Sequence, residues 1–214
     1  MGECHPLLDA RITLQITLDF PTLDLRGAIG YLLGSLPSVM ILARLMNLGN
    51  LREVGSGNIG ATNVLRTGNK KAAALTLLFD AGKGAIAVLL AQQLSSDQAV
   101  YAAGLMVFLG HCFPVWLRFR GGKGVATYFG IMWAAAWPAG LAASVVWLLI
   151  AAISRYSSLA ALFAAGWTPI ILVFVTDGNY FLLAAALGIL VYVRHKSNIA
   201  RLRAGTETKI GAKS

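Results

Sequence analysis

The segment from residue 52 to residue 66 brings together the groups that bind phosphate in proteins. Ser56, Asn58 and Asn63 offer side-chain hydrogen-bond donors, while Gly57 lets backbone amides approach an anion closely. Arg66 adds a planar guanidinium that suits a phosphate group. Flexible linkers and helix caps have a similar composition, and the spacing matches neither the P-loop nor the dinucleotide-binding fingerprint. Alone, this segment leaves both interpretations open.

A second glycine-rich segment, Gly-Gly-Lys-Gly at residues 121–124, comes directly before an apolar stretch. Backbone amides at the start of a helix attract anions, and Lys123 would add a positive charge at that place. Gly122 would keep the backbone open to a ligand. The alternative is ordinary basic flanking of a membrane helix, which explains Arg118 and Arg120 but not the glycines around Lys123. We therefore expect Gly122 and Lys123 to contact an anionic substrate.

A histidine and an asparagine, His195 and Asn198, lie three residues apart after the last apolar stretch. If the helix continues through them, they share one face. Histidine exchanges protons near neutral pH, and asparagine can orient it or a substrate. These two residues are the candidate catalytic pair. A basic tail on the membrane surface is the alternative interpretation of the segment.

Two charged residues, Asp80 and Lys83, interrupt an otherwise apolar stretch. Each costs about 2.5–3.5 kcal/mol at the centre of a membrane helix. Their spacing of three residues allows them to neutralise each other on one helix face. We expect a structural ion pair, with a proton relay as the alternative.

The composition indicates which environment these segments occupy. Hydrophobic residues make up 57% of the 214 residues and charged residues only 13%, whereas a soluble domain has about 25% charged residues. This composition predicts an integral membrane protein. The net charge is +9, but the aromatic residues are not interleaved with the basic ones. The basic residues therefore favour lipid headgroups and anionic substrates as partners and argue against nucleic acid.

Six apolar stretches, one of them long enough for two spans, predict seven transmembrane helices, since about 20 apolar residues are needed to cross a bilayer. The predicted spans are Gly27–Met46, Ala72–Leu94, Gln98–Leu117, two within Val125–Ser154, Leu159–Val175 and Tyr180–Val193. Pro37 falls inside the first span, and Pro138 is expected to divide the 125–154 stretch into a hairpin of two short helices. The predicted fold class is all-α, with residues 25–214 as a single membrane domain and residues 1–24 as an N-terminal tail.

The basic residues are distributed unevenly across these predicted spans. Fifteen of the 18 Lys and Arg residues fall in the loops and the tail on one side. The positive-inside rule places that side in the cytoplasm, which puts the N-terminus outside and the C-terminus inside. The loops on that side are also the long ones, and they contain all three polar segments. We therefore expect a single cytoplasmic site built from them.

Taken together, the three segments resemble the bacterial acyl-phosphate:glycerol-3-phosphate acyltransferase family. The resemblance is carried by Gly-Ser-Gly-Asn-Ile-Gly-Ala-Thr-Asn at 55–63, Gly-His-Cys-Phe-Pro at 110–114 with Gly-Gly-Lys-Gly-Val-Ala-Thr at 121–127, and Arg-His-Lys-Ser-Asn-Ile-Ala-Arg-Leu at 194–202 with a following Gly-Thr-Glu. It extends from the first span to about Glu207. It implies a seven-span enzyme of the bacterial inner membrane, with its N-terminus outside and its active site facing the cytoplasm.

The resemblance also implies an activity and residue roles. The family moves a fatty acyl group from acyl phosphate to glycerol 3-phosphate, which yields 1-acyl-glycerol 3-phosphate (lysophosphatidic acid) and phosphate in phospholipid synthesis. The functional positions of the family fall on Ser56, Arg66, Lys123, His195 and Asn198, with a phosphate-contacting serine at Ser158 and a structural glutamate at Glu207. The expected partners are the two substrates, membrane lipids and the enzyme that makes acyl phosphate.

Other functions fit the sequence less well. A transporter of phosphorylated anions would need charges midway through several spans and a symmetric pair of broken helices, whereas only Asp80 and Lys83 are deep. A scaffold that binds anionic lipid would explain the basic face but not the His195–Asn198 pair. No cofactor is expected, and no metal site is expected because the three histidines lie far apart without carboxylate companions.

Overall fold

The computed structural model describes residues 25, 27–93 and 97–212, and all regular elements within them are helices. Residues 27–35 are helical and are followed by α2 (Ser38–Leu45), α3 (Ala61–Leu65), α4 (Lys70–Gln92), α5 (Asp97–Cys112), the 3-10 helix η1 (Val115–Leu117), α6 (Val125–Ala135), α7 (Trp137–Ser154), α8 (Ser157–Val175), α9 (Phe181–Arg194) and α10 (Lys196–Arg203). The prediction of an all-α protein is confirmed for these residues. The expected tail at residues 1–24 lies outside them.

Five helical segments are long and apolar enough to cross a membrane. They are Gly27–Leu45, Lys70–Gln92, Asp97–Leu117, Trp137–Ser154 and Ser157–Val175. Two further apolar helices are shorter, because α6 has 11 residues and α9 has 14. Large apolar side chains cover the outside of the bundle, and Ile153 and Phe174 are each 82% exposed. An outer surface of this kind suits lipid rather than water.

Prolines mark the helix boundaries. The helix of the first predicted span is interrupted at Leu36 and Pro37, the proline that falls inside that span. The 125–154 stretch divides at Ala136, one residue before the expected Trp137-Pro138 pair, and proline then occupies the first turn of α7, where no amide donor is needed. The expectation of two short helices holds only for α6, because α7 has 18 residues. The third span ends at Leu117 as expected, but it is broken after Cys112, where α5 ends shortly before Pro114 and η1 follows.

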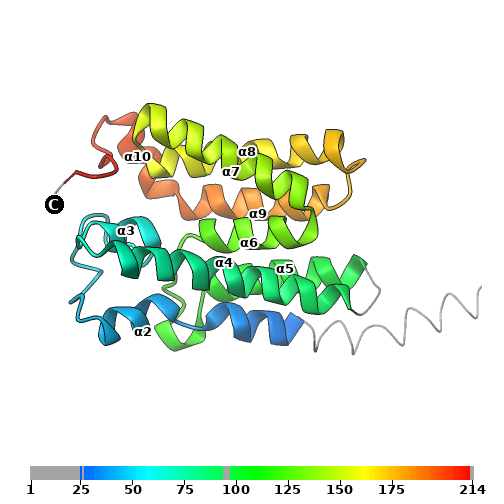
Figure 1. Cartoon of the computed structure of the whole chain (residues 1–214), viewed down its shortest axis with the longest axis horizontal. Helices are drawn as coiled ribbons and strands as arrows, with labels where there is room; N and C mark the ends of the chain where they lie inside the picture. Colours follow the sequence, from blue (N-terminus) through cyan, green and yellow to red (C-terminus); the bar gives the residue numbers. More distant parts are fainter. Residues whose placement is uncertain (1–24, 26, 94–96, 213–214) are drawn as a thin grey trace, which may run out of the picture.

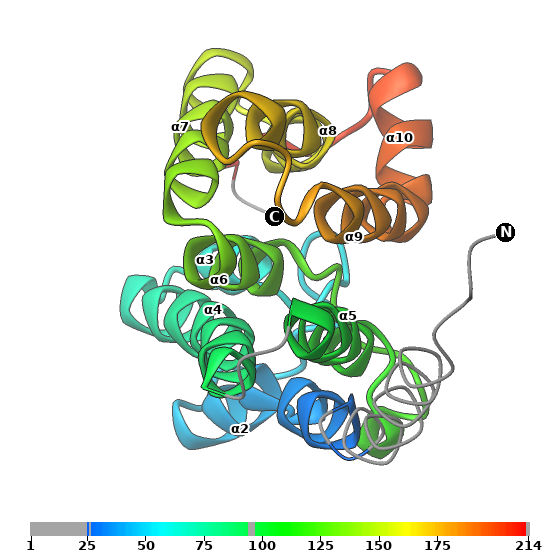
Figure 2. The ribbon, with the colours of Figure 1, turned by 90° about the vertical axis from the view of Figure 1, so that its right-hand side faces the viewer.

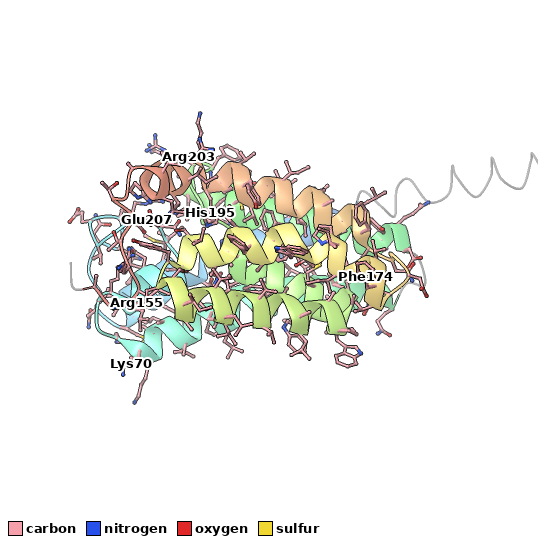
Figure 3. All side chains as sticks on the ribbon, turned by 90° about the horizontal axis from the view of Figure 1, so that it is seen from above. Lys70, Arg155, Phe174, His195, Arg203 and Glu207 are labelled. Carbon is pink, nitrogen blue, oxygen red and sulfur yellow. The ribbon has the colours of Figure 1, made fainter. Side chains whose placement is uncertain are left out.

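The helices form one elongated bundle whose polar loops gather at one end. Figure 1 shows α3, α10 and the C-terminal segment together at that end. In the end-on view, α6 lies in the middle of the bundle, with α4 and α5 on one side and α7, α8 and α9 on the other (Figure 2). Figure 3 places Lys70, Arg155, His195 and Glu207 at the polar end, while Phe174 lies at the opposite end. The three segments singled out in the sequence are therefore delivered to one place.

Close packing of α4 against α6 depends on glycines. A Cβ atom added at Gly130 would overlap the backbone carbonyl of Ala81, and one added at Gly84 would meet the carbonyl of Thr127. The two backbones thus approach directly, as is common between membrane helices with small residues at their interface. This contact fixes the start of α6, and with it the loop that carries Lys123.

Candidate active site

A cavity of about 520 Å³ opens at the polar end of the bundle and receives side chains from all three segments. Among its lining residues are ten of the expected site residues: Ser56, Asn58, Asn63, Arg66, Asp80, Lys123, Ser158, His195, Asn198 and Glu207. Gly57, Lys83 and Gly122 do not line it. The residues that we expected to act together therefore lie around one space, although they come from distant parts of the chain.

The first loop is organised by the side chain of Asn63. Its amide oxygen accepts hydrogen bonds from the Ser56 backbone N–H at 3.1 Å and from Arg66 Nη1 at 3.3 Å. Its amide nitrogen donates to the Leu51 carbonyl oxygen at 2.9 Å. The expected substrate contact of Asn63 thus competes with a clear positioning role. Gly57 has a φ of +67°, so it allows the turn rather than lining the cavity.

Arg66 keeps part of its guanidinium free for a ligand. Its Nη2 donates to the Thr208 carbonyl oxygen at 3.3 Å, while its Nε is buried and has no hydrogen-bond partner among the residues that the structure describes. Burial lowers the pKa of Arg66, but an arginine remains charged at neutral pH. A half-buried guanidinium that lines a cavity and has an unused donor is suited to bind an anion.

The glycine-rich loop at residues 121–124 places Lys123 against the third polar segment, residues 194–202. Its Nζ donates a hydrogen bond to Asn198 Oδ1. The loop is held by Arg194, whose Nε donates to the Gly122 carbonyl oxygen at 3.1 Å and whose Nη2 donates to the Gly121 carbonyl oxygen at 3.1 Å. Burial, together with repulsion by Arg201, lowers the pKa of Lys123 to about 8. The charged form of this partly buried ammonium would be stabilised by an incoming phosphate.

The pKa of Lys123 leads to a pH prediction. Above pH 8 the amine loses its proton, so kcat/KM for the phosphorylated substrates is expected to fall about tenfold per pH unit. Steady-state kinetics between pH 7 and 10 would measure this fall. The control is Lys123→Arg, which stays charged throughout and should show a flat profile whatever its absolute rate. An equal fall of kcat/KM with pH in Lys123→Arg would show that deprotonation of Lys123 is not the cause.

His195 lies between α9 and α10 with its ring held in one orientation. Helix α9 ends at Arg194, and His195 caps the start of α10. One continuous helix through His195 and Asn198, which would have placed both on the same face, is therefore not formed. The Nδ1 atom of His195 lies 2.8 Å from the Val191 carbonyl oxygen, so Nδ1 carries the proton and Nε2 has a free lone pair. Burial lowers the pKa of His195 to about 4. The imidazole is therefore neutral at physiological pH and able to accept a proton.

Glu207 is the hub that joins the third segment to α8. Its Oε1 accepts hydrogen bonds from Ser158 Oγ at 2.7 Å and Asn198 Nδ2 at 2.6 Å, and its Oε2 lies 2.7 Å from Arg201 Nε. Burial would raise the pKa of the carboxyl group, but these three donors outweigh it and hold the pKa below its usual range. This geometry suits the structural role expected for Glu207.

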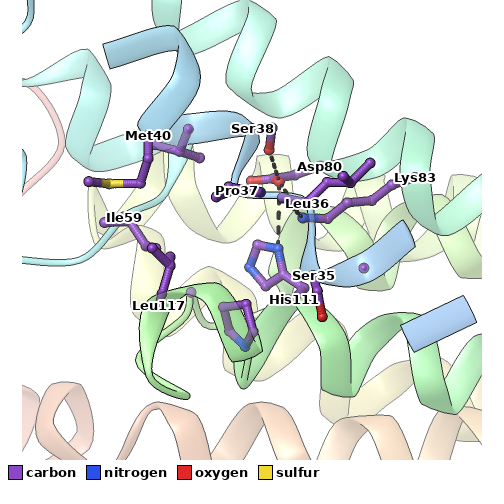
Figure 4. Close-up of a pocket in the computed structure, with 14 residues that line it drawn as sticks. Ser35, Leu36, Pro37, Ser38, Met40, Ile59, Asp80, Lys83, His111 and Leu117 are labelled. Carbon is purple, nitrogen blue, oxygen red and sulfur yellow. Dashed lines mark hydrogen bonds and ion pairs between the residues drawn. The ribbon is translucent and has the colours of Figure 1, made fainter. Parts of the chain in front are cut away.

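The expected ion pair between Asp80 and Lys83 is present, with a separation of 2.9 Å. Figure 4 shows two further side chains converging on the same carboxylate. Ser38 Oγ donates to Asp80 Oδ1 at 2.8 Å, and His111 Nδ1 lies 3.5 Å from that oxygen. His111 was not among the expected site residues. An ionisable residue near the end of a predicted span was the signal that could have identified it.

Replacing Lys83 with methionine is expected to lower the free energy of unfolding by about 3–5 kcal/mol, because a buried carboxylate would lose its cation. Thermal unfolding in detergent measures the change. Lys71→Met, at an exposed position near the start of α4, is the matched control and should change little. Adding Asp80→Asn to Lys83→Met should restore stability in part. A Lys83→Met protein as stable as the wild type would contradict the expected role of the ion pair.

Comparisons with known proteins bear directly on this site. A family model described as glycerol-3-phosphate acyltransferase matches residues 25–205. Proteins named glycerol-3-phosphate acyltransferase from Dinoroseobacter shibae and Roseobacter denitrificans are 56% and 55% identical to this chain, over 89% and 93% of it and 94% and 100% of their own lengths. The chain belongs to the glycerol-3-phosphate acyltransferase family. Every cavity residue named above except Glu207 and Thr208 lies inside the matched interval.

Two solved structures of a glycerol-3-phosphate acyltransferase share the fold. Both are crystal structures of PlsY (YgiH), described as an integral membrane glycerol 3-phosphate acyltransferase, in a glycerol 3-phosphate form and a lysophosphatidic acid form. They align with TM-scores of 0.82 and 0.79 at 38% and 35% identity, and each alignment covers 89% of this chain and 96% of the other.

Within the described residues, no cluster of three His, Cys, Asp or Glu side chains could hold a metal ion.

Proposed function

We propose that this chain is an integral membrane enzyme that transfers a fatty acyl group from acyl phosphate to glycerol 3-phosphate. The products are 1-acyl-glycerol 3-phosphate and inorganic phosphate. Membership of the family makes the chain an acyltransferase that acts on glycerol 3-phosphate. The observation that carries the proposal is the convergence of Arg66, Lys123 and His195 on one cavity that is polar at one end and apolar at the other.

The apolar part of the cavity suits the acyl chain. Leu77 of α4, Phe129 of α6, and Trp147 and Leu148 of α7 line it. It reaches as far as Ser144, ten positions before the end of α7 at Ser154, which corresponds to about 15 Å of helix. One leaflet of the hydrocarbon core has a similar depth, about half of 30 Å. A substrate with a charged head and a long tail fits this arrangement, and acyl phosphate is such a substrate.

The polar part of the cavity suits two phosphate groups at once. Arg66 and Lys123 would neutralise the repulsion between the headgroups and bring the glycerol hydroxyl close to the acyl carbonyl. Correct placement of two reactants can lower a barrier by roughly 7–11 kcal/mol. The donors of the first loop, Ser56 and Asn58, would complete the phosphate contacts, and Ser158 would join them if its hydroxyl turned from Glu207 to the phosphate.

The reaction exchanges one acyl–oxygen bond for another. The hydroxyl oxygen of glycerol 3-phosphate attacks the carbonyl carbon of acyl phosphate, and the bond from that carbon to the phosphate oxygen breaks. Inorganic phosphate leaves with the electron pair. The hydroxyl proton passes to Nε2 of His195, which is our candidate base, or to a phosphate oxygen of the substrate. Asn198, held by Glu207 and in contact with Lys123, would position both sides of the site.

The membrane topology is part of the proposal. The five long apolar segments, together with α6 and α9, would give seven spans. The excess of basic residues supports a cytoplasmic location for the polar end and the C-terminus and an outside location for the N-terminus. The protein would then reside in the bacterial inner membrane and receive acyl phosphate from the enzyme that makes it on the cytoplasmic side.

The donor is tested by phosphate release from the purified protein in detergent. Acyl phosphate with glycerol 3-phosphate should give stoichiometric phosphate and lysophosphatidic acid, whereas acyl-CoA should give no product. Omitting glycerol 3-phosphate controls for hydrolysis of the anhydride. Turnover with acyl-CoA, or no turnover with acyl phosphate, would refute the proposed donor. A transporter would show no turnover in this assay, since detergent leaves no separate compartments.

A further inference from the structure

We propose that His111 is a positioning residue. Its imidazole supports the backbone of the 121–124 loop at Gly122 and thereby fixes the position of Lys123. Its side chain lies between the buried carboxylate of Asp80 and the backbone of Gly122. The inference rests on the proposed function, because acyl transfer is the activity used to measure it. It assigns no contact with substrate to the imidazole, which acts through the loop.

The loop rests directly on His111. The Gly122 N–H donates to the His111 carbonyl oxygen at 3.2 Å, and the Gly121 N–H donates to the Cys112 carbonyl oxygen at 3.1 Å. A Cβ atom added at Gly122 would overlap Nε2 of His111. Gly122 was expected to contact substrate, but its lack of a side chain is required by the imidazole beneath it.

The opposite edge of the ring is fixed by three elements of the bundle. His111 belongs to α5, and its Nδ1 faces Asp80 of α4 at 3.5 Å. Asp80 is itself held by Lys83 at 2.9 Å and by Ser38 of α2 at 2.8 Å. Lys83 Nζ also lies 3.5 Å from the Leu36 carbonyl oxygen at the break in the first span. The buried ion pair therefore orients the ring, since Nδ1 faces the carboxylate and Nε2 faces the loop.

The space beside the ring makes the imidazole the main support of the loop. A small cavity of about 20 Å³ lies next to it, lined among others by Ser35, Asp80, His111 and Gly122 (Figure 4). That volume corresponds to about one water molecule. Because no side chain within residues 27–93 and 97–212 fills this space, removal of the imidazole would leave Gly122 without packing on the side of the loop that faces Asp80. From above, Arg194 holds the Gly121 and Gly122 carbonyl oxygens.

The consequence concerns Lys123, the next residue in the loop. Its ammonium group reaches Asn198 and lines the large cavity, while His111 lines both cavities. A displacement of about 1 Å at a binding group can reduce activity about 100-fold. In His111→Ala, the loop would shift into the space left by the imidazole, and Lys123 would move away from the phosphate-binding position. The predicted defect is therefore in substrate affinity rather than in the chemical step.

A second-site rescue tests the proposal. Gly122→Ala and His111→Ala should each reduce kcat/KM for the phosphorylated substrates by about 10–100-fold, mainly through KM. In the double variant the new methyl group would occupy the space left by the ring, so its KM should lie closer to the wild-type value than that of Gly122→Ala. Contacting residues show such coupling, whereas independent sites multiply their effects. Effects that multiply, or a loss confined to kcat, would overturn the proposal.

Two further variants keep the test decisive. His111→Asn is shorter but can still donate to Asp80, so it should fold even if His111→Ala does not, and it should rescue Gly122→Ala in the same way. Ser35→Ala, which lines the same small cavity without touching the loop, should keep wild-type KM values. The activity of the wild-type protein distinguishes a failure of the proposed acyl donor from a failure of the proposed role of His111. Its failure to use acyl phosphate would refute the proposed donor, whereas an active wild type without rescue would refute the role of His111 alone.

Discussion

Replacing His195 with alanine is expected to lower kcat by about 10²–10⁴-fold, which is the usual contribution of a positioned acid–base group. The imidazole is buried, neutral and held by the Val191 carbonyl at Nδ1, so its Nε2 is the free proton acceptor. The phosphate contacts that we assign to Arg66 and Lys123 do not pass through this ring. KM values should therefore change little, and steady-state kinetics with each substrate would separate the two effects.

A neighbouring residue provides the control for His195. Lys196→Ala removes an exposed cation from the next position and should retain wild-type kinetics. Thermal unfolding of both variants would establish that the fold is intact. If His195→Ala turned over at nearly the wild-type rate, a phosphate oxygen of the substrate would be the base, and the catalytic assignment of His195 would be wrong.

Replacing Arg66 with alanine should reduce kcat/KM by about 10²–10³-fold, since the variant loses a half-buried charge with an unused donor beside the substrate cavity. Arg66→Lys should recover only a small part of this loss. A lysine provides a point charge, but it cannot reproduce the planar fork that contacts Asn63 and Thr208 and would bind a phosphate at the same time. Initial rates across a range of both substrates would measure these changes.

An exposed arginine at the same end of the bundle tests whether the effect is specific. Arg203 is exposed and does not line the cavity, so Arg203→Ala should behave as the wild type. The ratio of the wild-type kcat/KM to that of Arg66→Ala should persist at high salt, because the guanidinium is half-buried beside the cavity and is screened less than a surface charge. Equal losses in the two variants would indicate that a general positive surface, rather than a specific contact of Arg66, attracts the substrate.

The grouping of the three polar segments could be predicted from the sequence because it follows from topology. Apolar stretches of span length alternate the loops between two sides, and the basic residues mark one of them. Ser56, Lys123 and His195 therefore had to lie on the same face, and they do line one cavity. Proline predicted the divisions of the first and fourth helical stretches for an equally local reason.

The contacts within the site could not be predicted, since they join residues without any shared periodicity. Arg66 meets the Thr208 carbonyl across 142 positions, and Ile210 folds back to the backbone of Arg155. The role of a glycine is also invisible in a sequence. Gly57 serves a turn with positive φ, and Gly122 makes room for His111; their expected roles in binding an anion stay predictions. Asn63, also expected to contact substrate, lines the cavity and in addition organises its own loop.

Photo-crosslinking with a substrate analogue tests most directly whether one cavity holds the headgroup and the acyl chain together. The probe is an acyl phosphonate, which cannot transfer its chain, with a diazirine near the middle of that chain. Crosslinks are predicted at the apolar wall formed by Leu77, Phe129 and Leu148, and they should be lost in Arg66→Ala or with excess unlabelled phosphonate. Crosslinks spread over outward-facing positions such as Phe174, with the same yield in Arg66→Ala, would contradict the account.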